Sequence, residues 1–373
     1  MIAPNCFGAS IRGDVSNMRA GHNLFAVAFI AIIGAVMLVP SEQSADAKFE
    51  AAGTVFRADP ALDAVLPLGT KIEKLVTCCK WTEGPIWIHQ GYLIFADIPG
   101  NRIMKWTPEG QLSVFMQPSG YRGATPYKGI EPGSNGMTLD RQGRLTVAGH
   151  AARNVWRMES LEKGAQVTVL ADQYEGQRLN SPNDLVYKTD GSLYFTDPPY
   201  GLETQDDKDP KKELAFNGVF RIRGATSQGP GAPPDAKQLD LLVKDLTRPN
   251  GLGFSPDEKH LYVAVSDPAQ KIWMRYDVKP DGTLDNGKVF YDATSDTEDG
   301  LPDGLKVDRE GNVYSAGPGG VWIFSPEGKH LGTIKPGEKV ANCNWGGADG
   351  KTLYITASTS LYRIRLINSG IRP

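Results

Sequence analysis

Six segments of the chain alternate apolar and polar residues in the same way. Each begins with an acid or an amide, continues through a few alternating residues, crosses a short polar turn and ends in residues rich in Tyr, Leu, Val and Thr. A period of two is typical of β-strands, so each segment predicts a hairpin. The first residues of the segments, called openers below, are Glu83, Asn135, Asn183, Asn250, Asp303 and Asn342.

Five of the six openers are followed by a glycine at the same distance along the chain. A turn that needs a positive φ favours glycine, because there is no Cβ to clash. The exception is the fourth segment, in which Glu258 takes this place and the turn is one residue longer. The openers recur at intervals of 39 to 67 residues, about the size of a four-stranded propeller blade. The pattern therefore predicts an all-β fold, a six-bladed β-propeller.

The N-terminus carries a different pattern, an uncharged apolar run over residues 24–39. Sixteen residues are few for a membrane-spanning helix, which needs about 20. Ala45 and Ala47 supply the small residues of a signal peptidase site, which predicts a cleaved secretory signal and a mature start near Lys48. The alternative is an uncleaved anchor. We expect a leader over residues 1–47, an extension over 48–75 and the propeller over 76–373, in a periplasmic or secreted protein without membrane contact.

Composition and cysteines narrow the picture further. A net charge of −3 without a basic run gives no footprint for nucleic acid. Removal of the leader would remove Cys6 and leave three cysteines. Cys78 and Cys79 could form a vicinal disulfide, one of them could bridge to Cys343, or the thiols could be free.

The openers also carry candidate chemistry, because equivalent positions of successive blades surround one axis. Two carboxylates and four amides near an axis lose solvation unless something satisfies them. Calcium binds carboxylate and Asn oxygens in flexible geometry, so the ring predicts a divalent cation site. The competing interpretation is that Asn-Gly and Asp-Gly are ordinary turn dipeptides. That interpretation does not explain why carboxylates stand at only two openers, Glu83 and Asp303.

Four short strings around the openers resemble those of the gluconolactonase/regucalcin (senescence-marker)/luciferin-regenerating-enzyme family. They are Trp-Thr-Glu-Gly-Pro at 81–85, Ser-Pro-Asn-Asp at 181–184, Arg-Pro-Asn-Gly at 248–251 and Pro-Asp-Gly-Leu at 302–305. The segment Tyr-Phe-Thr-Asp-Pro-Pro-Tyr-Gly at 194–201 is similar to the bacterial gluconolactonase branch. The resemblance implies that Glu83, Asn250 and Asp303 bind a metal ion, that Asn183 adds a metal or substrate contact, and that Asp303 is also the general base. It departs at Ser181, where the family has an arginine; Arg178 lies three residues earlier.

The resemblance implies a lactonase that hydrolyses a small sugar-type lactone such as glucono-1,5-lactone. A divalent ion would polarise the carbonyl; Ca²⁺ is expected, with Zn²⁺, Mg²⁺ and Mn²⁺ as alternatives. We expect Asn135, Asn183, His150 and Tyr200 near the substrate, with His150 either a proton shuttle or a structural histidine. The alternatives are a non-catalytic periplasmic propeller that binds calcium or another ligand, and a hydrolase of other lactones or of phosphotriesters.

Overall fold

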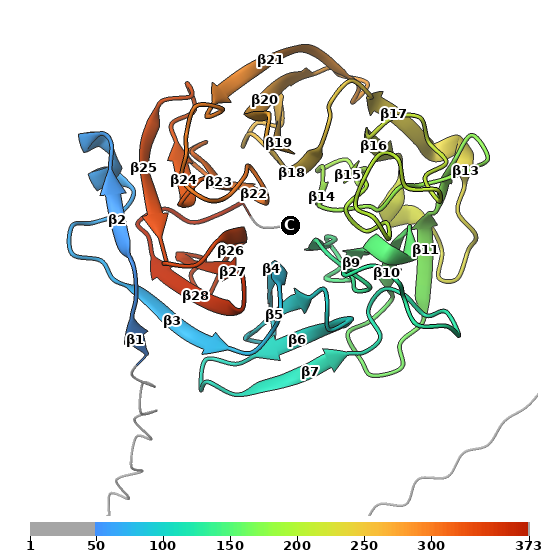
Figure 1. Ribbon diagram of the computed structural model, residues 1–373, viewed down its shortest axis with the longest axis horizontal. Helices are drawn as coiled ribbons and strands as arrows, with labels where there is room; N and C mark the ends of the chain where they lie inside the picture. The colour runs from blue at the N-terminus through green and yellow to red at the C-terminus, as the bar shows by residue number, and fades with distance from the viewer. Residues whose placement is uncertain (1–48, 372–373) are drawn as a thin grey trace, which may run out of the picture. The chain divides into compact units, whose positions relative to one another are not determined.

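The computed structural model describes residues 49–371, in which six antiparallel β-sheets are arranged as the blades of a propeller (Figure 1). A seventh, two-stranded sheet pairs β12 (Gln173–Tyr174) with β13 (Gln177–Arg178) in the connection between the second and third blades. The prediction of a six-bladed, all-β propeller is confirmed. The leader predicted over residues 1–47 and the start at Lys48 lie outside the described residues. Between residues 49 and 371, no helix is long and apolar enough to span a membrane.

Each blade presents four strands in chain order from the centre of the ring outward, except that the sixth is completed by an N-terminal strand. The innermost strands are β4 (Thr82–Ile88), β8 (Met137–Leu139), β14 (Leu185–Tyr187), β18 (Pro249–Phe254), β22 (Leu305–Val307) and β26 (Val340–Gly346). The second strands are β5 (Tyr92–Asp97), β9 (Leu145–Ala148), β15 (Leu193–Asp197), β19 (His260–Asp267), β23 (Val313–Gly317) and β27 (Thr352–Ala357). The third strands are β6 (Arg102–Trp106), β10 (Val155–Met158), β16 (Gly218–Ile222), β20 (Gln270–Val278), β24 (Gly320–Phe324) and β28 (Ser360–Arg365). The outer strands of the first five blades are β7 (Leu112–Met116), β11 (Val167–Ala171), β17 (Leu239–Val243), β21 (Leu284–Asp292) and β25 (His330–Lys335).

The turns between first and second strands have the predicted conformation. All five glycines at these turns have a positive φ, for example +93° at Gly91 and +91° at Gly311. Glu258, which replaces glycine in the fourth blade, adopts a φ of +55°. The left-handed conformation is therefore required by the turn itself, and glycine is the residue that adopts it with least strain.

The ring is closed by the N-terminal part of the described chain. β3 (Ile72–Thr77) is the outer strand of the sixth blade, where it pairs with β28, and β1 (Glu50–Ala51) pairs in turn with β3. β2 (Thr54–Arg57) adds a fifth strand to the fifth blade by pairing with β25 (Figure 1). The last blade thus combines strands from both ends of the chain, so it cannot form until the ring closes.

The cysteines follow one of the alternatives left open by the sequence. Cys78 and Cys79 form a disulfide directly after β3, whereas Cys343 on β26 is a free, buried thiol. Burial raises the pKa of Cys343 to about 12. Because the thiolate is the reactive form, Cys343 is an inert core residue in the folded protein.

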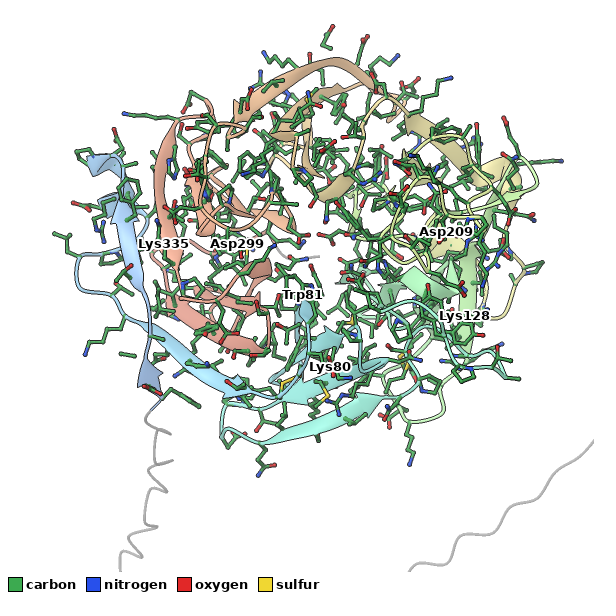
Figure 2. All side chains as sticks on the ribbon, in the orientation of Figure 1. Lys80, Trp81, Lys128, Asp209, Asp299 and Lys335 are labelled. Atoms are coloured by element: carbon green, nitrogen blue, oxygen red, sulfur yellow. A yellow bond between two sulfur atoms is a disulfide. The ribbon has the colours of Figure 1, made fainter. Side chains whose placement is uncertain are left out.

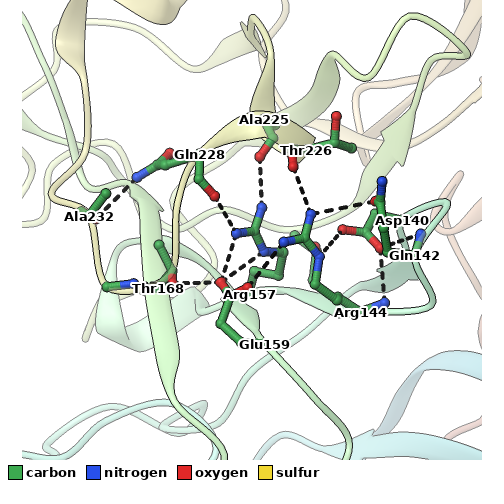
Figure 3. A network of polar contacts seen from close by, with 12 residues as sticks. Asp140, Gln142, Arg144, Arg157, Glu159, Thr168, Ala225, Thr226, Gln228 and Ala232 are labelled. Atoms are coloured by element: carbon green, nitrogen blue, oxygen red, sulfur yellow. Dashed lines mark hydrogen bonds and ion pairs between the residues drawn. The ribbon is translucent and has the colours of Figure 1, made fainter. Parts of the chain in front are cut away.

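The second and third blades are joined by a network around the fully buried Arg157 of β10 (Figure 3). Its guanidinium donates to the carbonyls of Ala225 and Gln228 in the β16–β17 connection, both at 2.7 Å. It also forms an ion pair with Glu159, and Glu159 accepts a hydrogen bond from Thr168 at 2.6 Å. The planar fork of arginine therefore connects a strand of one blade to an inserted loop of the next.

We expect Arg157→Lys to lower the free energy of unfolding by about 2 kcal/mol, since a lysine keeps the charge but cannot make the separate bonds to both carbonyls and Glu159. Urea unfolding followed by tryptophan fluorescence measures this loss. Arg141→Lys is the matched control, because Arg141 is exposed. Equal stability of the two variants would show that the network does not stabilise the fold.

Candidate active site

Five of the six openers line one cavity of about 200 Å³ where the inner strands begin. Glu83 and Asn250 lie within β4 and β18, while Asn135, Asn183 and Asp303 each stand two residues before an inner strand. Trp81, which also lines the cavity, lies near the centre of the ring (Figure 2). The repeat that forms the blades therefore also brings the polar openers of five blades to one cavity.

Four of these side chains have no hydrogen-bonding partner in the described part of the chain. The side-chain oxygens of Asn135 and Asn250 are buried and unpaired. No hydrogen bond or ion pair to another residue of 49–371 involves the side chains of Asn183 or Asp303 either. Buried polar groups in proteins are nearly always satisfied, so a cluster of unpaired oxygens indicates a place where a ligand binds.

Glu83 is held more firmly. Its Oε2 accepts hydrogen bonds from the backbone N–H of Gly84 at 2.7 Å and from Nδ2 of Asn342 at 2.9 Å. Asn342, the sixth opener, does not line the cavity; it lies behind Glu83, with Nδ2 also 3.5 Å from Asp184 Oδ2. Both hydrogen bonds are accepted by Oε2, so Oε1 of Glu83 is available to a ligand in the cavity.

Burial and neighbouring negative charges disfavour the ionised forms of Glu83 and Asp303, the two carboxylates among the openers. Burial raises the pKa of Glu83 to about 7, and the negative charge of Asp184 adds to this effect. Burial and the charges of Glu83, Asp184 and Glu131 raise the pKa of Asp303 well above its usual range. A positive charge in the cavity would favour the ionised form of both groups.

The donor set fits a hard divalent cation. Two carboxylates would balance its charge, and the unpaired amide oxygens are ligands of the kind that calcium binds. Within residues 49–371, no group of three or more His, Cys, Asp or Glu side chains is arranged to hold a metal. A cation in this cavity would therefore depend on amide oxygens, and the set lacks the thiolate and imidazole ligands that zinc prefers.

The other two residues expected near the substrate occupy different positions. Tyr200 lines the cavity, and its hydroxyl donates to the Ser266 carbonyl; burial raises the pKa of Tyr200 to about 12. His150 is fully buried and does not line the cavity. Its Nε2 lies 2.8 Å from Oε2 of Glu131, and Glu131 does line the cavity. Arg178 lies elsewhere, in a separate depression of about 470 Å³.

Sequence reasoning missed Glu131, Gln205 and Lys339, which also line the cavity. All three come from connections between strands, outside the repeated pattern. Glu131 belongs to the long 118–134 connection, in which Tyr121, Arg122 and Tyr127 line the separate depression instead. A carboxylate one position before Pro132 in that long connection was the available signal.

Comparison with known proteins agrees with this geometry. Residues 81–359 match the family described as SMP-30/Gluconolactonase/LRE-like region. The chain is similar to the gluconolactonase of Zymomonas mobilis, with 40% identity over 322 residues that cover 84% of this chain and 86% of the relative.

Solved structures give the same result. The gluconolactonase of Xanthomonas campestris is 30% identical, with a TM-score of 0.69 over 85% of this chain and 97% of that one. The calcium-binding protein regucalcin of Agrobacterium tumefaciens shares the fold, with 17% identity and a TM-score of 0.61 over 80% of this chain and 95% of that one. The chain therefore belongs to the SMP-30/gluconolactonase/LRE-like family.

Proposed function

We propose that this protein is a lactonase that hydrolyses a sugar-type lactone such as glucono-1,5-lactone to the aldonic acid. The observation that carries the proposal is the cluster of unpaired side chains of Asn135, Asn183, Asn250 and Asp303 in one small cavity. The gluconolactonases of Zymomonas mobilis and Xanthomonas campestris, both at least 30% identical, support the substrate class.

Glu83, Asn183, Asn250 and Asp303 are the residues that would hold a divalent cation, for which Ca²⁺ is the ion best suited to this oxygen set. The ion would act as a Lewis acid on the lactone carbonyl. Its charge would also keep Glu83 and Asp303 ionised in spite of their burial. The related fold of regucalcin, described as calcium-binding, supports this choice.

The chain's own residues account for the remaining steps. Asp303 takes a proton from a water molecule whose oxygen adds to the carbonyl carbon. The bond between that carbon and the ring oxygen then breaks, and the ring oxygen takes up the proton that Asp303 removed, so that the lactone opens and the Asp303 carboxylate is regenerated. Glu83 is fixed by hydrogen bonds from Gly84 and Asn342, so its role is to hold the cation in place.

The test is acid release from glucono-1,5-lactone by the mature protein, corrected for spontaneous hydrolysis in buffer. We expect the activity to fall to the buffer rate after EDTA treatment, because no ion is then left to polarise the lactone carbonyl. Addition of calcium should restore the activity. Re-addition of Mg²⁺, Mn²⁺ or Zn²⁺ to parallel samples compares the ions. Full activity after EDTA would contradict the metal dependence. Inactivity of a folded, metal-binding protein toward a panel of lactones would instead favour a binding propeller.

A further inference from the structure

The Glu131–His150 pair is a second polar feature of the cavity, built from outside the repeat. Glu131 lies in the 118–134 connection and lines the cavity, with its side chain 19% exposed. His150 follows β9, at the start of a 3-10 helix over His150–Ala152. Its side chain is fully buried and contacts Glu131 from outside the cavity lining. The 2.8 Å contact between Glu131 and His150 joins two connecting segments that do not pair within any blade.

The imidazole of His150 is held from several sides. Its Nδ1 faces the carbonyl oxygen of Pro182 at 3.4 Å. A Cβ at Gly201 would lie 2.8 Å from Cδ2 of His150, so the ring rests directly against the backbone of the 198–217 connection. His150 has a φ of +41°, a left-handed conformation that costs energy in a residue other than glycine. Strain of this kind persists where the surrounding structure fixes a side chain.

Both ring nitrogens of His150 face oxygen atoms, Nε2 the Glu131 carboxyl group at 2.8 Å and Nδ1 the Pro182 carbonyl at 3.4 Å. A ring N–H at Nε2 is the donor that an ionised Glu131 needs. Oε2 of Glu131 is therefore occupied by His150. No other hydrogen bond or ion pair within residues 49–371 involves the carboxyl group, so Oε1 is left for a ligand in the cavity.

A sugar lactone presents several hydroxyl groups around its ring, and each needs a partner when it leaves water. The ring carboxylates Glu83 and Asp303 serve the cation, the carbonyl and the attacking water in the proposed function. Of the remaining cavity groups, Tyr200 directs its hydroxyl to Ser266, and Gln205 donates to the Tyr200 carbonyl at 3.0 Å. Glu131 is the carboxylate left over for the substrate's hydroxyl groups.

We propose that Glu131 is a specificity residue that accepts hydrogen bonds from the hydroxyl groups of the lactone, and that His150 is a positioning residue that fixes its carboxyl group. This inference rests on the proposed function and deepens it. A carboxylate held in place in advance loses less entropy on binding, and hydrogen bonds to charged groups are stronger than neutral ones. The pair would make the cavity select polyhydroxylated lactones over plain ones.

The experiment compares two lactones with the same six-membered ring, glucono-1,5-lactone and δ-valerolactone, which lacks hydroxyl groups. Glu131→Gln keeps the shape but removes the charge, so we expect kcat/KM for gluconolactone to fall about 30-fold, chiefly through KM. The fall for δ-valerolactone should be at least tenfold smaller. His150→Asn should change the same ratio in the same direction but less, and its thermal unfolding shows whether it folds. Glu109→Gln, at an exposed turn, is the matched control.

Each outcome decides between the explanations. Equal losses on both lactones in Glu131→Gln would overturn the proposal, because they would indicate a role in the chemistry or the fold. An unchanged ratio with unchanged rates would overturn it as well. A wild-type protein that hydrolyses neither lactone would instead overturn the proposed function, and this inference with it.

Discussion

The Asp303→Asn variant will hydrolyse glucono-1,5-lactone with a kcat about 10³-fold lower than that of the wild-type protein. Asparagine has nearly the same shape and keeps one oxygen toward the cavity, but it cannot take a proton from water. Asp303 makes no side-chain hydrogen bond within residues 49–371, so the substitution breaks no contact that the fold needs. The loss should therefore appear in the rate and not in the stability.

Initial rates of acid release over a range of lactone concentrations measure kcat and KM for this variant. Asp245→Asn is the matched control, since Asp245 is exposed and does not line the cavity. Calcium-dependent thermal stabilisation, measured on the same samples, separates loss of the base from loss of a ligand. A variant that keeps more than a tenth of the wild-type kcat would show that another group takes the proton.

The fold was predictable because the repeat is written in residues that the turn and the strand demand. Glycine at the hairpin turn follows from the positive φ there, and alternation follows from the pleat. The openers Glu83, Asn250 and Asp303 could be found in the same way, since their place in the repeat fixes their place in the ring. Their assigned roles stay predictions.

Asn135, Asn183 and Tyr200 were also expected near the cavity and line it, but the position of Asn342 and the contribution of Glu131 could not be predicted, for two physical reasons. A repeat fixes where a backbone position lies but not how deeply its side chain reaches. Asn342 is in register with the other openers, yet its side-chain amide donates a hydrogen bond to Glu83 and does not line the cavity. Glu131 and His150 meet through connections, whose course depends on contacts between blades and leaves no period in the sequence.

A chain of polar contacts leads from Glu83 away from the cavity, through Asn342 and Asp184 to Lys306. Glu83 is bonded by Asn342, Asn342 lies 3.5 Å from Asp184, and the ammonium of Lys306 lies 3.0 Å from the Asp184 carboxylate. Asp184 is 1% exposed, and Lys306 lines a separate cavity of about 210 Å³ near the ends of the inner strands. This chain of contacts therefore runs from Glu83 in the candidate active site to Lys306 at the second cavity.

Lys306→Met should lower the free energy of unfolding by about 3–5 kcal/mol, because it leaves the buried Asp184 carboxylate without its counter-charge. Denaturant unfolding at neutral pH measures the loss, with the exposed Lys259→Met as the matched control. Asp184→Asn in the same background removes the orphaned charge, so the double variant should recover part of the stability that Lys306→Met loses. Losses that simply add would show that the two groups are not coupled. Strong coupling would mean that the ammonium offsets a third carboxylate beneath the ring, which leaves Glu83 and Asp303 as the two charges that a divalent cation would balance.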